Sequence, residues 1–175
     1  MIQIHTDGSC LGNPGAGGWA AVIVNGTERE EIFGGEKHTT NNRMELTAAI
    51  RALEKIPAGE SVELFTDSSY LKNAFTNGWL VKWKSNGWRT ANKSPVLNRD
   101  LWLELDALIA VRAVKFNWVK GHAGNRFNER CDFLARTTAE KIQRGQLSPP
   151  KPVNIPKPKP TPKANRPIQL SLFDL

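Results

Sequence analysis

The distribution of proline along the 175-residue chain sets the strongest limit on what can fold. Eight of the eleven prolines fall between residues 149 and 167, interspersed with Lys, Thr and Asn. Such a segment cannot bury an apolar core and favours extended conformations. The composition therefore predicts a folded body over residues 1–144, a disordered Pro/Lys-rich linker over 145–167, and a short terminal segment over 168–175 in which apolar residues return.

Apolar patterns in the body follow an order that is typical of α/β domains. Strands are expected at 2–7, 19–24, 29–37, 61–67 and 113–119, and helices at 39–56, 68–76, 77–84, 97–110 and 126–144. The glycine-rich stretch at 12–18 and the Asn25-Gly26 pair predict turns. This order predicts an α/β fold with a five-stranded mixed sheet flanked by helices.

Charge and cysteine content exclude several classes of protein. The chain carries a net charge of +7, but residues 145–175 hold five basic residues and one acidic residue, which leaves only +3 for the body. The two cysteines form no CxxC pair or Cys/His cluster, so no zinc site is expected. Neither a signal segment nor an apolar run of the ~20 residues that span a bilayer is present. We expect a cytoplasmic monomer without membrane association.

Four acidic residues stand where elements are expected to begin or end. Asp7 and Asp67 are predicted to end the first and fourth strands, Glu45 lies in the helix at 39–56, and Asp132 can join them from the last helix. If the two strands are neighbours, their carboxyl ends meet at one edge of the sheet. Clustered carboxylates repel one another, and hard cations such as Mg²⁺ or Mn²⁺ relieve that repulsion. The alternative is that Asp67 merely caps a helix and Asp7 opens a turn.

Longer strings around these acids carry a specific resemblance. The segments are DGSCLGNPGAGGWA at 7–20, TTNNRMELTAAIRAL at 39–53, TDSSYL at 66–71 and WVKGHAGNRFNERCDFLA at 118–135. In this order they closely resemble the bacterial ribonuclease HI group of the type 1 ribonuclease H family, over roughly residues 1–143. Four ordered motifs make a far stronger signal than one short pattern.

The resemblance implies a ribonuclease H-like fold and an endonuclease that hydrolyses the RNA strand of RNA–DNA hybrids. It implies two Mg²⁺ ions, with Mn²⁺ as a possible substitute, and products with 5′-phosphate and 3′-hydroxyl ends. The implied metal ligands are Asp7, Glu45, Asp67 and Asp132. The histidine of the KGHAG loop, which assists proton transfer or product release in the family, falls on His122.

The resemblance also implies residues that contact the hybrid. It places Asn13, Asn41 and Asn42 near the RNA strand, whose 2′-hydroxyl distinguishes it from DNA, and Thr40 and Asn98 near a DNA phosphate. Turn and cap duties are the alternative for the asparagines, and the two roles are compatible. Where the family commonly has Gln, this chain has Ser69, which puts one substrate contact in doubt.

Residues 79–102 combine basic and tryptophan side chains. Basic groups bind phosphates, and aromatic faces pack on sugars or bases. In the family this stretch is a basic protrusion that grips the DNA strand, and we assign that contact to Lys82, Lys84 and Trp88. Trp79 and Trp102 are instead expected in the core.

The terminal segment suggests a docking peptide. QLSLF at 169–173 resembles the peptide by which bacterial proteins bind the replication sliding clamp, with Gln169, Leu170, Leu172 and Phe173 as the contacting residues. An extended linker would reach about 70 Å. A nonfunctional remnant, or a peptide that packs on the body, is the alternative.

Three other functions are compatible with parts of the sequence: another nuclease of the same broad fold, such as a junction resolvase or the nuclease domain of a reverse transcriptase, a noncatalytic hybrid-binding module, and a clamp-bound adaptor. The KGHAG loop argues against the resolvase, and the chain has no room for a polymerase. The presence of all four carboxylates argues against the noncatalytic module.

Overall fold

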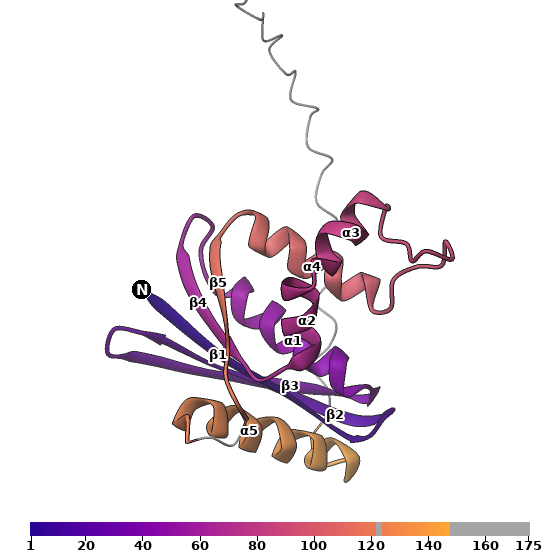
Figure 1. Cartoon of the computed structure of the whole chain (residues 1–175). Helices are drawn as coiled ribbons and strands as arrows, with labels where there is room; N and C mark the ends of the chain where they lie inside the picture. Colours follow the sequence, from indigo (N-terminus) through magenta and orange to yellow (C-terminus); the bar gives the residue numbers. More distant parts are fainter. Residues whose placement is uncertain (122–123, 148–175) are drawn as a thin grey trace, which may run out of the picture.

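The computed structural model describes residues 1–121 and 124–147 and places them in one mixed sheet with helices on both faces (Figure 1). The strands are β1 Ile2–Gly12, β2 Gly15–Asn25, β3 Glu28–Thr39, β4 Ser61–Thr66 and β5 Ala113–Trp118. The helices are α1 Asn41–Glu54, α2 Ser69–Thr76, α3 Trp79–Ser85, α4 Arg99–Ala110 and α5 Arg126–Gln143. This confirms the predicted fold class.

The sheet has the strand order β3-β2-β1-β4-β5. The first three strands form an antiparallel meander, whereas β4 runs parallel to both β1 and β5. Because β1 and β4 are parallel neighbours, their carboxyl ends point the same way, which is the condition under which Asp7 and Asp67 were expected to lie close together.

The main core lies between the sheet and α1. Within the helix predicted at 39–56, Leu46, Ala49, Ile50 and Leu53 recur at i, i+3, i+4 and i+7, which is the spacing of an amphipathic helix, and all are 0% exposed. On the opposite face, α5 packs Cys131 and Ala135 against small and β-branched residues of β2 (Figure 1). Trp102 is fully buried, as expected, and Trp79 packs against the core while partly exposed.

The glycine-rich stretch at 12–18 differs from its prediction as a turn. Strand β1 continues to Gly12, and β2 begins at Gly15, so only two residues connect them. A Cβ at Gly8 would lie 2.4 Å from the backbone nitrogen of Glu45, and one at Gly18 would lie 2.1 Å from the carbonyl oxygen of Ala135. Gly17 and Gly18 of this stretch, together with Gly8 before it, therefore allow α1 and α5 to approach the sheet closely. Asp7 lies within β1 rather than at its end.

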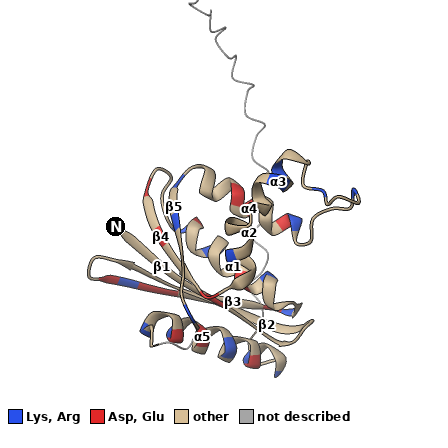
Figure 2. Ribbon diagram, in the orientation of Figure 1, with Lys and Arg blue, Asp and Glu red and all other residues tan. Residues whose placement is uncertain are grey.

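Charges are distributed unevenly over the surface. Figure 2 shows acidic residues along the start of β3 and basic residues along α3 and the loop that follows it. Among the helices of the described residues, none combines the length and apolar character needed to cross a bilayer.

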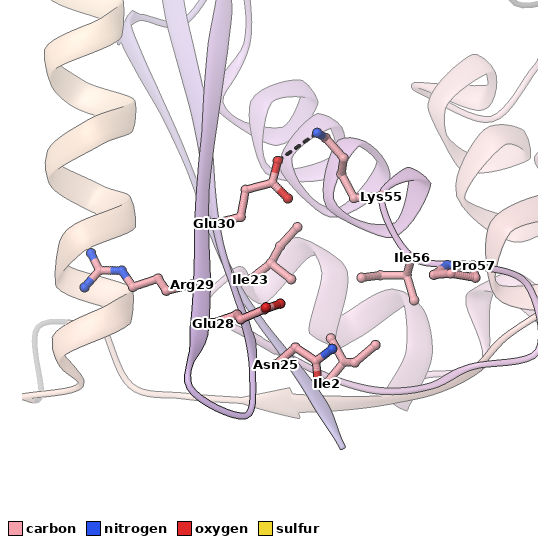
Figure 3. Close-up of a pocket in the computed structure, with 9 residues that line it drawn as sticks. All are labelled: Ile2, Ile23, Asn25, Glu28, Arg29, Glu30, Lys55, Ile56 and Pro57. Carbon is pink, nitrogen blue, oxygen red and sulfur yellow. Dashed lines mark hydrogen bonds and ion pairs between the residues drawn. The ribbon is translucent and has the colours of Figure 1, made fainter.

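A pocket of about 510 Å³ lies at the end of the sheet where β1 begins and β2 turns into β3 (Figure 3). It is lined by Ile2, Ile23 and Ile56, and by Lys55 and Glu30, which form an ion pair. None of the four predicted catalytic acids lines this pocket.

Candidate active site

Asp7 and Asp67 are brought together by the pairing of two strands. Thr6 of β1 is the register partner of Thr66 of β4, and one acid follows each of these threonines. The backbone N–H of Gly8 donates to Oδ1 of Asp7 over 2.7 Å. The strand register thus fixes both carboxylates at the carboxyl end of β4, even though β1 continues past Asp7.

Glu45 reaches the same region from α1. The helix begins after Thr40, whose Oγ1 accepts the backbone N–H of Arg43 over 3.4 Å. The Glu45 carboxylate accepts two hydrogen bonds, from Nδ2 of Asn41 to Oε1 at 2.9 Å and from Oγ of Ser68 to Oε2. Since Ser68 directly follows Asp67, this second bond joins Glu45 to the end of β4.

Asp132 is supplied by α5, on the opposite face of the sheet. Asn125 caps this helix by accepting the backbone N–H groups of Phe127 and Asn128. Asn128 lies four residues before Asp132, and its Nδ2 donates to Oδ2 of Asp67 over 3.3 Å. The guanidinium of Arg136 lies 3.8 Å from the Asp132 carboxylate.

The four acids interact electrostatically. The pKa of Asp7 is raised to about 8, chiefly by burial and next by the charge of Asp67, with smaller contributions from Asp132 and Glu45. The hydrogen bond from Gly8 opposes the increase. Burial also raises the pKa of Glu45, with a contribution from Asp67, while the hydrogen bonds from Ser68 and Asn41 lower it. Burial is the larger cause of both shifts, and the charge of Asp67 raises the pKa of both Asp7 and Glu45.

The chemistry of this site suits a hard divalent cation. Its donors are carboxylate oxygens without a thiolate, which is the preference of Mg²⁺ and Mn²⁺. A cation would offset the repulsion between carboxylates that, after burial, contributes to the raised pKa of Asp7. Within residues 1–121 and 124–147, however, no three His, Cys, Asp or Glu side chains are gathered closely enough to enclose an ion. Donor type and charge therefore fit a metal, and the side chains would have to draw closer around it.

The predicted hybrid-contacting residues lie near this site to different degrees. Oδ1 of Asn13, in the β1–β2 turn, accepts the backbone N–H of Asn41 over 3.2 Å, which joins two of the predicted contacts. Asn42 is partly exposed on the same first turn of α1. Asn98 precedes α4 and is reached by the Arg43 side chain.

The protrusion departs from expectation at one residue. Lys82 and Lys84 are exposed on α3, and Lys84 forms an ion pair with Asp106 at 2.9 Å. Trp88 is only 9% exposed and its ring lies 6.4 Å from that of Trp83. Its burial leaves little surface for a nucleic acid, so the structure gives Trp88 a packing role and we omit it from the proposed interface.

Several predicted residues lie outside the part of the chain that the structure describes. They are His122 of the KGHAG loop and the clamp-docking residues Gln169, Leu170, Leu172 and Phe173. Gly121, which precedes His122, is described: a Cβ there would lie 2.6 Å from Oδ2 of Asp67. The start of the loop is therefore next to the carboxylates.

Ser68, Asn128 and Gly121 are site residues that the sequence analysis missed. Ser68 donates to Glu45 and also accepts the backbone N–H of Leu71 as a helix cap. The spacing of four between Asn128 and Asp132 places both on one face of a helix, which was an available signal. Nothing in the sequence indicated that Gly121 approaches Asp67.

The fold and the arrangement of acids together define a class: an α/β domain with acidic residues gathered around the carboxyl end of β4, where β1 pairs with it. The family model described as RNase H matches residues 1–140. The chain belongs to the ribonuclease H family, and it is therefore a nuclease of the hydrolase class. Enzymes of this family depend on divalent metal ions.

Curated relatives and solved structures agree with this assignment. A protein named Ribonuclease H from Rhodopseudomonas palustris (strain TIE-1) is 56% identical over 135 residues, which cover 77% of this chain and 86% of that protein. A Ribonuclease H from Nitratidesulfovibrio vulgaris (strain DSM 19637 / Miyazaki F) is 55% identical over 139 residues, covering 79% of this chain and 88% of the relative.

Two solved structures are similar in fold. LC9-RNase H1, described as a type 1 RNase H with the type 2 active-site motif, superposes with a TM-score of 0.70 at 32% identity, covering 83% of this chain and 73% of that one. LC11-RNase H1, solved in complex with an RNA/DNA hybrid, superposes with a TM-score of 0.60 at 26% identity, covering 81% and 98%.

Proposed function

We propose that this chain is an endoribonuclease that hydrolyses the RNA strand of RNA–DNA hybrids with two divalent ions, Mg²⁺ or alternatively Mn²⁺. The observation that carries this proposal is the pairing of Thr6 with Thr66, which sets Asp7 beside Asp67, while hydrogen bonds from Ser68 and Asn128 join Glu45 and α5 to the same strand end. An anionic cluster of this kind is stable when cations neutralise it. The hybrid bound in the LC11-RNase H1 structure supports the choice of substrate.

Asp7, Glu45, Asp67 and Asp132 would hold the ions. When bound, such a pair activates the attacking water and stabilises the leaving oxygen of a phosphodiester. Departure of the 3′ oxygen leaves a 3′-hydroxyl on one fragment and a 5′-phosphate on the other. We assign His122 to proton transfer or product release.

The chain's own hydrogen bonds orient these ligands. Ser68 and Asn41 hold the two oxygens of Glu45, and Asn128 holds Oδ2 of Asp67. Groups that fix metal ligands in this way reduce the reorganisation needed when an ion binds. The three neutral donors also compensate part of the negative charge before the ions arrive.

The hybrid would lie across α1, the β1–β2 turn and the protrusion. Asn13, Asn41 and Asn42 offer neutral donors and acceptors to the 2′-hydroxyls of the RNA strand. Thr40 and Asn98 would hold a phosphate of the DNA strand. Exposed Lys82 and Lys84 would bind further phosphates, with Lys84 shared with Asp106.

Strand-labelled substrates test this function. Hybrid, RNA duplex and DNA duplex, each labelled in turn on either strand, are incubated with Mg²⁺ and the wild type or Asp7→Asn. We expect the wild type to cut only the RNA of the hybrid, and Asp7→Asn to cut nothing. Cutting of branched DNA, or binding of the hybrid without cutting, would instead support one of the other functions.

We also propose that residues 168–175 dock on the replication sliding clamp through Gln169, Leu170, Leu172 and Phe173. The linker would then keep the nuclease at a raised local concentration near replicating DNA, without changing its chemistry. This proposal rests on the sequence of the segment alone. The cytoplasmic location and the monomeric state likewise stay predictions.

A further inference from the structure

Arg43 joins two helices through its guanidinium. Its Nη1 and Nη2 donate to the two carboxylate oxygens of Asp100 over 3.0 and 2.8 Å, so α1 and α4 are held by a bidentate ion pair. Nη1 also lies 3.4 Å from Oδ1 of Asn98, the residue that precedes α4. Arg43 follows Thr40 by one helical turn and precedes Glu45 by two residues.

The nitrogen of the Asn98 side-chain amide faces the hydroxyl of Tyr70, whose hydrogen-bonding direction is set by its other neighbours. Oη of Tyr70 lies 3.3 Å from Nδ2 of Asn98 and 3.0 Å from Nε1 of Trp102. An indole nitrogen only donates, so the hydroxyl oxygen accepts there, and its own proton is directed to the carbonyl oxygen of Leu97 at 3.5 Å. The atom of Asn98 that faces Tyr70 is therefore a donor.

These neighbours fix the orientation of the Asn98 amide. A guanidinium only donates, so Arg43 requires the amide oxygen, and Tyr70 requires the amide nitrogen. A flip of the amide would set donor against donor at Arg43. The nitrogen carries two protons, and among the residues that the structure describes only Tyr70 accepts one of them, so the second N–H can bind an external acceptor. The backbone of Asn98 is itself held in the left-handed region, at φ 57°.

We propose that Arg43 is a positioning residue for the DNA strand: held by Asp100, it orients the Asn98 amide so that the free N–H of Asn98 and the hydroxyl of Thr40 bind one phosphate. This inference rests on the proposed function, in which Thr40 and Asn98 contact the hybrid. It adds that this phosphate contact depends on Arg43, although Arg43 does not touch the phosphate and its charge is balanced by Asp100. The same guanidinium also ties this contact to the helix that carries Glu45.

A second ion pair between the same helices provides a matched control. Arg51 lies 3.4 Å from Glu104, and therefore also joins α1 to α4, two helical turns beyond Arg43. Neither residue belongs to the proposed site. A loss of helix docking alone would affect both pairs alike, whereas loss of amide orientation would follow only from changes at Arg43 or Asp100.

The test compares Arg43→Met, Asp100→Asn and Asn98→Ala with Arg51→Met and Glu104→Gln. For cleavage of a hybrid oligonucleotide, the first three are expected to raise KM about 10-fold, which corresponds to one lost hydrogen bond to a charged group, with kcat nearly unchanged. The two control variants are expected to leave both constants at wild-type values while lowering the melting temperature. Arg43→Lys, which keeps one donor for the Asn98 oxygen, should recover part of the wild-type KM.

Hybrids with a single uncharged methylphosphonate in the DNA strand identify the phosphate. At one position the substitution should raise KM for the wild type and cause no further increase for Arg43→Met, because the contact is already lost. A wild-type KM for Arg43→Met and Asp100→Asn, alongside a raised KM for Asn98→Ala, overturns the positioning role alone. A wild-type KM for Asn98→Ala overturns the proposed DNA contact as well, while RNA-strand cleavage tests the function separately.

Discussion

Asn128 donates its side-chain Nδ2 to Oδ2 of Asp67 over 3.3 Å, so a residue of α5 holds a carboxylate that belongs to the end of β4. The two residues are 61 positions apart, and Asn128 is only 3% exposed. One turn further along α5, Asp132 contributes to the same site. The helix thus supplies one proposed metal ligand and the orienting partner of another.

Replacing Asn128 with Ala should therefore weaken metal use more than it weakens the fold. We expect the Mg²⁺ concentration for half-maximal cleavage to rise about 10- to 100-fold, as is usual when the partner of a metal ligand is removed. Cleavage rates measured across a Mg²⁺ titration, with circular dichroism as the check on folding, would show this. An unchanged Mg²⁺ dependence in a folded variant would contradict the assigned role of Asn128.

The raised pKa of Asp7 predicts how stability changes with pH when metal is absent. Because the folded-state pKa, about 8, exceeds the ordinary value of 3.8, the folded protein binds this proton more tightly than the unfolded chain does. This contribution to stability is full below about pH 4 and is lost as the pH rises to about 8. The cause is burial, together with the charges of Asp67, Asp132 and Glu45.

Asp7→Asn should accordingly stabilise the metal-free protein. We expect the free energy of unfolding to rise by about 2–4 kcal/mol near pH 9, allowing for partial screening, and by much less near pH 5. Urea denaturation in the presence of a chelator measures both values. Glu63→Gln is the control, since its ion pair with Lys115 lowers the pKa of Glu63 and its loss should give no gain. Equal stability of wild type and Asp7→Asn near pH 9 would show that ionised Asp7 is not destabilised by burial and by the neighbouring carboxylates.

Gly121→Ala should move the Asp67 carboxylate. The added Cβ would lie 2.6 Å from Oδ2 of Asp67, and displacement by about 1 Å in an active site can reduce the rate about 100-fold. We expect the cleavage rate to fall at least about 10-fold with little change in the melting temperature. Gly59→Ala should behave oppositely: its φ of +89° makes the change destabilising, yet no atom lies within 4 Å of the added Cβ. Full activity of Gly121→Ala would show that the loop yields instead of Asp67.

Removal of residues 168–175 should abolish binding to the sliding clamp while leaving cleavage of a short hybrid unchanged. The full-length protein with both Leu170 and Phe173 changed to Ala should give the same result, because the pockets of the clamp would lose their apolar contacts. Surface plasmon resonance with immobilised clamp measures the first property, and a standard cleavage assay the second. Equal clamp affinity with and without the segment would end this proposal.

The sequence predicted the element order, because it follows from local patterns, and apolar spacing located α1. It placed Asp7 at the end of the first strand, whereas β1 continues to Gly12. The features that the sequence did not predict depend on contacts between segments that are far apart in the chain. Gly18 lies in the stretch that was predicted as a turn, yet it allows α5 to approach the sheet.

Trp88 is a residue for which the local sequence pattern suggested a surface role, whereas the fold buries it. In sequence it belongs to an alternation of basic and aromatic residues that is typical of nucleic-acid binding. In the fold, the loop after α3 turns this ring toward Trp83, and a backbone bond from its N–H to the Trp83 carbonyl oxygen, 2.6 Å long, holds it there. The Ser68–Glu45 bond was likewise invisible, since it depends on how close α1 lies to the end of β4.

The central claim is that four carboxylates act as one metal-dependent site on the RNA strand. The most direct measurement is the rate of RNA-strand cleavage in saturating Mg²⁺ for Asp7→Asn, Glu45→Gln, Asp67→Asn and Asp132→Asn. Glu63→Gln is the control, because Glu63 lies on β4, the strand that Asp67 follows, and pairs with Lys115 instead of the other acids. Each of the first four should lose at least about 100-fold in rate, more than is lost with an orienting partner, and the control should match the wild type. Wild-type rates in any of the four folded variants would contradict the account.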